Sequence, residues 1–181
     1  VRDPILKDVS LRLHTTCVGI YNDRGVALSD EKRLTKVRAR AVVVATGCQE
    51  QPAVFANNDL PGIILGDAAR NLIERYAVCP AENPVIFTAG TEGYRLAHTL
   101  VGLGKKVAAL IDLWDIRLSA STLEEIASAG VPHYSGYAIV EAKRDRRKAS
   151  VGAAVVRRLN SAGAPVGNRK IISCGGIIIT V

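Results

Sequence analysis

One run of residues constrains the fold of this 181-residue chain more than any other. The spacing of apolar residues predicts a strand over Val85–Ala89, a turn over Gly90–Gly93, a helix over Tyr94–Leu103 and a second strand over Lys106–Ile111. Gly104 follows the helix, where a glycine commonly ends one. Strands and helices that alternate at this length form right-handed parallel βαβ units. The chain is therefore expected to be an α/β protein with a Rossmann-like parallel sheet.

Further elements are predicted on both sides of this unit. Two more helices and one short strand extend the α/β region: Gly66–Val78, Ser121–Ala129 and Pro132–Tyr134. Antiparallel meanders flank it. The first comprises Val9–Tyr21, Val26–Leu28 and Lys36–Ala45, and the second comprises Tyr137–Ala142, Ser150–Leu159 and Lys170–Val181. Because the strand over Lys36–Ala45 becomes wholly apolar at Val42–Val44, we expect it to enter a parallel sheet there, buried on both faces.

The turn after Val85–Ala89 is a candidate dinucleotide site. Glycine lets the backbone approach a pyrophosphate, and a helix N-terminus offers free N–H groups with a positive dipole. Gly90, Thr91 and Gly93 would line this site, with Ala97 as a small packing residue. An acidic residue is expected at the end of the next strand, about 20 residues on. Asp112 stands there, and its carboxylate would favour NAD over NADP because it repels a 2′-phosphate.

Glu92 leaves a second interpretation of this turn open. Its carboxylate stands where the phosphate would approach, so it competes with a bound anion while stabilising the helix. The turn either holds a nucleotide or belongs to a doubly wound scaffold whose site has been closed. Trp114 follows Asp112 closely and either stacks on an adenine ring or packs against the neighbouring helix.

A second candidate site follows the apolar run Val42–Val44. The chain continues Ala45-Thr46-Gly47, and small side chains allow a backbone to pass close beside a bound dinucleotide. Thr46 and Gly47 are therefore candidate cofactor-binding residues. Cys48 comes next; with no partner cysteine nearby, it is interpreted as a small buried residue rather than a redox thiol.

These motifs together resemble a known family. The order of meander, Ala-Thr-Gly strand, connector, βαβ unit and second meander is similar to that of flavoproteins with two dinucleotide-binding domains. Within them the chain most resembles the alpha subunits of heterotetrameric sarcosine oxidases and the related amine and opine oxidases and cyanide synthases. The residues that carry the resemblance are Arg38–Gly47, Pro52, Val54–Asp59, Pro61-Gly62, Arg75-Tyr76 and Tyr94-Arg95.

The resemblance implies an oxidoreductase subunit in which electrons from an amine or amino acid pass to flavin, within a hetero-oligomeric oxidase. FAD and NAD are the cofactors it implies for the intact protein. The family's first glycine fingerprint has no counterpart here, so we expect this chain to be an internal fragment that holds neither cofactor tightly and turns over no substrate. The absence of a dithiol motif argues against the disulfide-reducing branch, and no residue qualifies as catalytic.

The same resemblance predicts the domains. Residues 1–56 are expected to form part of an FAD-type fold, with 171–181 as a candidate segment to return to it. Residues 57–170 are expected to form the NAD(P)-type domain. The chain lacks methionine, so we expect its ends to be cuts within a longer protein.

Composition excludes several other classes. No apolar run approaches the roughly 20 residues that a membrane-spanning helix needs, and Val1–Ser10 is no signal peptide. The four cysteines are widely spaced, which argues against a zinc site. Their even number allows disulfides, but four buried or semi-buried thiols in a reducing, cytoplasmic setting are favoured. The net charge of +7 is concentrated between Lys143 and Lys170, and the rest of the chain is nearly neutral.

The basic segment Lys143–Lys148 supports a third function, binding of nucleic acid. No aromatic residue interleaves it, so we expect a solvated hairpin tip, with a subunit contact as the next alternative. A methyltransferase-like role for the glycine turn is a more distant interpretation.

Overall fold

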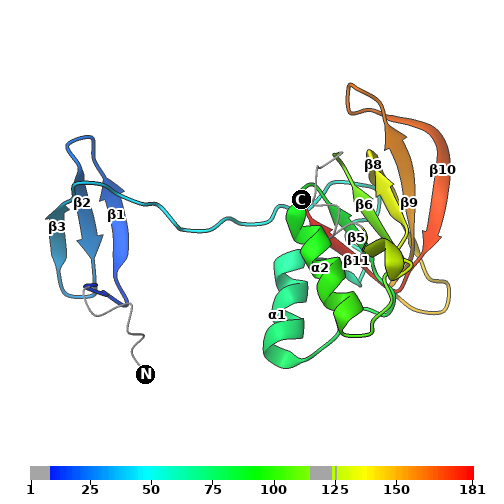
Figure 1. Ribbon diagram of the computed structural model, residues 1–181, viewed down its shortest axis with the longest axis horizontal. Coiled ribbons are helices and arrows are strands. Elements are labelled where there is room, and N and C mark those ends of the chain that lie inside the picture. Colours follow the sequence, from blue (N-terminus) through cyan, green and yellow to red (C-terminus); the bar gives the residue numbers. More distant parts are fainter. Residues whose placement is uncertain (1–8, 115–123, 125) are drawn as a thin grey trace. The chain divides into compact units, whose positions relative to one another are not determined.

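The computed structural model describes residues 9–114, 124 and 126–181 (Figure 1). The chain divides into two compact units, Val1–Cys48 and Gln49–Val181. Each is described below by itself. The predicted helix over Ser121–Ala129 lies partly outside the described residues; of its described residues, Glu124 and 126–128 are helical.

The first unit contains a three-stranded antiparallel sheet in the order β1-β2-β3. Its strands are β1 (Thr16–Ile20), β2 (Gly25–Ser29) and β3 (Leu34–Arg38). The turn between β1 and β2 is closed by the Gly25 carbonyl, which accepts a hydrogen bond from the Tyr21 amide at 2.8 Å. This is the predicted first meander.

The prediction that the third strand continues through Val42–Val44 into a parallel sheet is wrong. β3 ends at Arg38, and Val43 is 89% exposed. A strand that is buried on both faces needs neighbouring strands and covering layers. The described part of this unit supplies only the three-stranded sheet, so the apolar run remains extended and exposed.

The second unit is built on a five-stranded parallel sheet in the order β4-β11-β5-β6-β7. Its strands are β4 (Ile63–Leu65), β5 (Val85–Thr88), β6 (Ala109–Asp112), β7 (His133–Ser135) and β11 (Ile177–Thr180). Every residue of β5, β6 and β11 is buried, as expected for central parallel strands.

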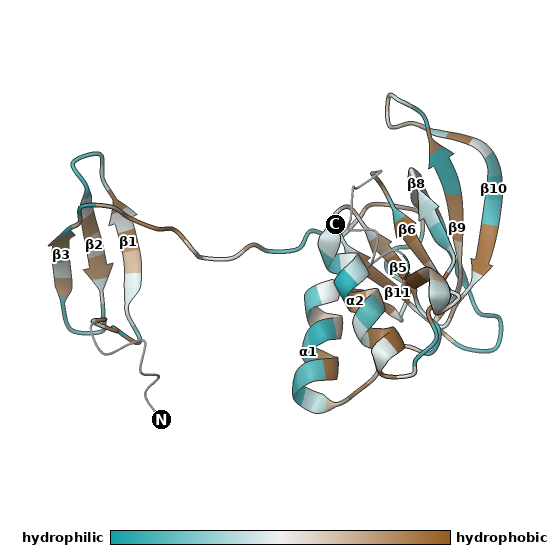
Figure 2. Cartoon of the chain, in the orientation of Figure 1, coloured by the Kyte–Doolittle hydropathy of each residue, from teal (hydrophilic) through white to brown (hydrophobic). Residues whose placement is uncertain are grey.

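Two helices cover one face of this sheet: α1 (Gly66–Tyr76) and α2 (Thr91–Gly102). Ala69, Tyr94 and Leu100 pack there against Ile86 of β5, together with Leu110 and Ile178 of the neighbouring strands. Figure 2 shows mostly apolar colour along the sheet and mixed colour on both helices, which is the pattern of amphipathic helices over a buried sheet. The predicted α/β class with a Rossmann-like parallel sheet is confirmed.

The other face of the sheet is covered by an antiparallel meander in the order β10-β9-β8. Its strands are β8 (Tyr137–Arg144), β9 (Val151–Leu159) and β10 (Pro165–Ser173). Ile139, Val151 and Val156 of the meander share a core with Phe87 and Ile179 of the parallel sheet. The second unit therefore has three layers: helices, parallel sheet and antiparallel sheet.

The end of the chain departs from the predicted single strand over Lys170–Val181. β10 ends at Ser173, and β11 begins at Ile177 in a different sheet, between β4 and β5. The glycines between them allow the crossing, because a Cβ on Gly175 would overlap the Glu82 carbonyl and one on Gly176 would overlap Ala81. Residues 171–181, predicted as a candidate segment to return to the FAD-type fold, lie in β10 and β11 and pair with strands of the second unit. The predicted domain boundaries stay a prediction.

The cysteines also differ from the prediction. Cys17, Cys48 and Cys79 are exposed, and only Cys174 of the four is buried. The three exposed thiols lie on an exposed strand or in connections between elements, where no described layer covers them. Burial raises the pKa of the Cys174 thiol.

Candidate functional site

The predicted glycine turn and Asp112 lie at the same edge of the parallel sheet. β5 ends at Thr88 and β6 ends at Asp112, and these two residues pair in register. Thr180 at the end of β11 also pairs with Thr88. Since α2 begins directly after this edge, its N-terminus and the carboxyl ends of three strands form one candidate site, the place where doubly wound sheets bind ligands.

The N-terminus of α2 is open at Gly90. This residue caps the helix with an extended backbone (φ −153°, ψ −174°), and it forms no side-chain capping bond. A Cβ placed on Gly90 would meet no atom within 4 Å. Thr91, the first helical residue, is exposed. A ligand phosphate could therefore reach the first-turn N–H groups of α2.

Gly93 serves packing. A Cβ on Gly93 would overlap Thr88 Cβ and would lie 2.7 Å from Thr88 Oγ1 and 2.9 Å from Thr180 Oγ1. The bare α-carbon thus lets α2 approach β5 and β11. This is the role of the third glycine in the G-x-G-x-x-G fingerprint.

Thr88 also belongs to this candidate site, although the sequence patterns above did not predict it. Reading the fingerprint backwards from Gly93 places Gly90 at its second glycine and Thr88 at its first, which is the signal that could have found it. The Thr88 hydroxyl accepts a hydrogen bond from the Gly90 amide at 3.1 Å and lies 2.7 Å from the Gly90 carbonyl oxygen, to which it donates. The turn is thus bridged by a side chain where the fingerprint has none.

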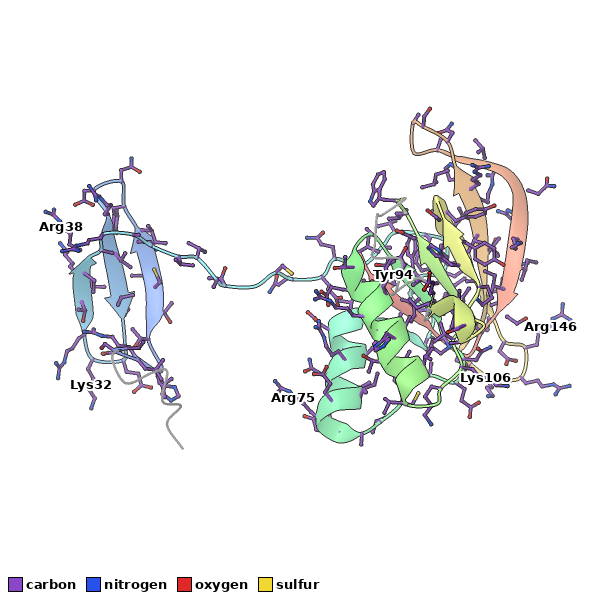
Figure 3. All side chains as sticks on the ribbon, viewed as in Figure 1. Lys32, Arg38, Arg75, Tyr94, Lys106 and Arg146 are labelled. Carbon is purple, nitrogen blue, oxygen red and sulfur yellow. The ribbon has the colours of Figure 1, made fainter. Side chains whose placement is uncertain are left out.

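Asp112 is fully buried and already bonded. Tyr94 of α2 donates its hydroxyl proton to Asp112 Oδ2 at 2.5 Å, and the Trp114 amide donates to Oδ1 at 3.0 Å. The Tyr94 oxygen also lies 2.9 Å from His133 Nε2. Figure 3 labels Tyr94 between α2 and the sheet. The predicted ribose acceptor therefore lies at the predicted place, with internal partners on both oxygens. The Trp114 side chain is 59% exposed.

Glu92 points its carboxylate at arginines on both helices. Oε1 lies 2.7 Å from Arg95 Nη1, and Oε2 lies 3.5 Å from Arg70 Nη1 of α1. Arg70 also pairs with Asp67 in the first turn of α1. Glu92, Arg95 and Arg70 line a cleft between α1 and α2. The arginines offset the negative charge that Glu92 brings to the phosphate end of the site.

Glu50 closes the same cleft from the segment that precedes α1. Its Oε2 accepts a hydrogen bond from the Asp67 amide at 2.6 Å, so Glu50 supplies the cap that the N-terminus of α1 lacks locally. Burial raises the pKa of the Glu50 carboxyl, and the nearby carboxylates of Asp67 and Glu92 act in the same direction.

The free energy of unfolding of Glu50→Gln, measured relative to that of the wild type, is expected to increase as the pH rises from about 4 to 7. A carboxyl whose pKa is raised in the folded state binds more protons folded than unfolded, so its contribution to stability falls as the pH rises through that window. Urea titrations at both pH values, followed by circular dichroism, measure the difference. Glu82→Gln, an exposed site in the same unit, is the matched control and should show no such trend. An equal trend in both variants would contradict the expectation.

Thr46 and Gly47 lie in the first unit, on the exposed connection after β3. Gly47 has a left-handed backbone (φ 75°), which glycine adopts without strain. Their role as cofactor-binding residues stays a prediction. The basic segment Lys143–Lys148 spans the last two residues of β8 and the start of the connection to β9, and Figure 3 labels Arg146 projecting outward from it.

Within the described ranges, no group of three His, Cys, Asp or Glu side chains is arranged to hold a metal ion. Neither of the helices given above is long and apolar enough to span a membrane.

Sequence comparisons find relatives that are oxidoreductase subunits. No family model matches the chain. The sarcosine oxidase subunit alpha of Rhizobium meliloti is 41% identical over 81 residues, covering 45% of this chain and 8% of that subunit. The corresponding subunit of Corynebacterium sp. strain P-1 is 36% identical over 118 residues, covering 65% of this chain and 12% of that subunit. The resemblance to these subunits is thus confirmed. The chain spans about a tenth of their length.

Structure comparisons agree on the fold. A thioredoxin reductase of T. acidophilum matches with a TM-score of 0.57 at 15% identity, over 89% of this chain and 49% of that one. A ferredoxin reductase of Rhodopseudomonas palustris matches with a TM-score of 0.59 at 17% identity, over 100% of this chain and 44% of that one. The chain therefore has a fold that is found in both of these reductases.

Proposed function

We propose that the chain is the dinucleotide-fold region of an oxidoreductase alpha subunit, in which electrons from an amine or amino acid pass to flavin. The observation that carries this proposal is the 36% identity to a sarcosine oxidase alpha subunit over 118 residues. The open N-terminus of α2 at Gly90 supports a nucleotide site within it. The first unit, with Thr46 and Gly47, would contribute to an FAD-type fold in the intact protein. The intact protein would work with other subunits.

The nucleotide site fits an NAD-type cofactor well at one end. The first-turn N–H groups of α2 would hold the pyrophosphate, and Gly90 leaves room for it. The Arg70 and Arg95 guanidinium groups would keep the Glu92 carboxylate turned toward the α1–α2 cleft. The ribose end fits less well, because Asp112 is buried and bonded on both oxygens. A nicotinamide cofactor, when bound, would supply hydride chemistry.

NAD is expected to bind the full chain weakly, and Glu92→Gln is expected to bind it about 2–5-fold more tightly. The substitution removes a like charge near the phosphate, a term of about 0.3–1 kcal/mol at a helix N-terminus. Isothermal titration calorimetry with NAD and with ATP measures both affinities. Glu82→Gln changes the net charge equally at a distant exposed site and should leave the affinity unchanged.

A second candidate function is a scaffold that packs subunits without a bound nucleotide. The internal hydrogen bonds of Asp112 and of the Gly90 amide favour it, because groups that would hold a nucleotide are already paired. Absence of heat with NAD for both the wild type and Glu92→Gln would reject the nucleotide site and leave the scaffold.

A further inference from the structure

We propose that Thr88 sets the affinity of the nucleotide site, by holding the Gly90 amide in an internal hydrogen bond that a dinucleotide phosphate must displace. The inference rests on the proposed function, because it concerns the same glycine turn. Thr88 is a positioning residue here: it acts through the Gly90 backbone.

The geometry of the turn supports this role. Thr88 is fully buried at the end of β5, so its hydroxyl is held beside the turn. Its oxygen accepts the Gly90 N–H at 3.1 Å while its proton is directed at the Gly90 carbonyl 2.7 Å away. The Thr180 carbonyl is a second acceptor at 3.4 Å. The Thr88 hydroxyl oxygen therefore occupies the place on the Gly90 amide that a phosphate oxygen would take.

The surrounding residues pack closely on Thr88 but leave the turn itself open. Gly93 and Thr180 contact the Thr88 side chain, and the missing Cβ of Gly93 makes the room for it. Open space nevertheless remains over Gly90. A phosphate can thus approach the turn, but it meets an amide that is already paired. Breaking that pairing lowers the net gain from the new hydrogen bond.

Removal of the hydroxyl is expected to strengthen NAD binding. Thr88→Val keeps the branched shape and frees the Gly90 amide, so NAD should bind about 2–10-fold more tightly, which corresponds to one ordinary hydrogen bond. Thr88→Ser keeps the hydroxyl and should stay within about 2-fold of the wild type. Thr88→Ala also removes the hydroxyl and serves if the valine variant folds poorly. Thermal melts of all three check the fold.

Calorimetry with NAD on the full chain separates the outcomes. Tighter binding by Thr88→Val or Thr88→Ala, but not by Thr88→Ser, supports the proposal. Equal or weaker binding by the hydroxyl-free variants overturns it, while a wild type that binds NAD preserves the proposed function. Binding by Thr88→Val alone supports the role of Thr88 and rejects nucleotide binding by the native chain. No heat from any variant overturns both proposals.

An independent measurement tests the hydrogen bond without a ligand. Amide hydrogen exchange by NMR should be faster at Gly90 in Thr88→Val than in Thr88→Ser, because the amide loses its acceptor. Equal exchange rates in the two variants would overturn the proposal.

Discussion

Gly93→Ala is expected to lower the free energy of unfolding of the second unit by about 1–3 kcal/mol. The added Cβ would lie within 3 Å of the hydroxyl oxygens of Thr88 and Thr180, which end two central strands. Neither strand can retreat easily, because both are buried and hydrogen-bonded on each side. Chemical unfolding followed by circular dichroism measures the loss.

Gly102→Ala provides the matched control for this prediction. Gly102 lies in the same helix, and a Cβ there would meet no atom within 4 Å. Alanine favours a helix over glycine by up to about 1 kcal/mol, so this variant should be slightly more stable than the wild type. The same substitution is thus expected to have opposite effects at two positions of α2. A loss of similar size at both would contradict the packing role of Gly93.

Tyr94→Phe is expected to cost about 1–3 kcal/mol of stability, since it removes the hydroxyl group and little else. The Asp112 carboxyl is fully buried, and Oδ2 would lose the donor that lies 2.5 Å away. A buried acceptor that loses its partner keeps the full cost of its desolvation. The measurement is again the free energy of unfolding.

Tyr76→Phe is the control for the Tyr94 variant. Tyr76 ends α1 and is 68% exposed, so its hydroxyl is solvated in both the folded and the unfolded state. Its replacement should change the stability by no more than about 0.5 kcal/mol. Equal effects at Tyr94 and Tyr76 would show that the Asp112 hydrogen bond contributes nothing measurable.

Local patterns were sufficient to predict most of the second unit. The periodicity of the Val85–Asp112 region predicted a strand, turn, helix and strand that the structure shows within a few residues. Such segments are predictable because each carries its own apolar spacing and its own turn residues. The position of Gly90 and Asp112 at one edge of the sheet could also be predicted, since the carboxyl ends of parallel strands lie at a common edge.

Other features depended on distant contacts and could not be predicted in the same way. The run Val42–Val44 has the composition of a buried strand, but burial requires a partner sheet that the described residues of its unit lack. The hydrogen bonds of Thr88 and Tyr94 depend on how closely α2 approaches the sheet, which is a property of packing. The split of Lys170–Val181 into two strands depends on Gly175 and Gly176 crossing a backbone segment from another part of the chain.

The position of β11 has a consequence for how this unit folds. The strand pairs with β4, more than a hundred residues earlier in the chain, and with β5 on its other side. β4 and β5 are therefore joined only through a strand that leaves the ribosome after every other strand of the sheet. Such non-local pairing is slow, because the entropy of closing a long loop must be overcome first. During synthesis the edges of β4 and β5 stay unpaired until residues 177–180 emerge, and this interval is when a growing chain is most exposed to aggregation and chaperone capture.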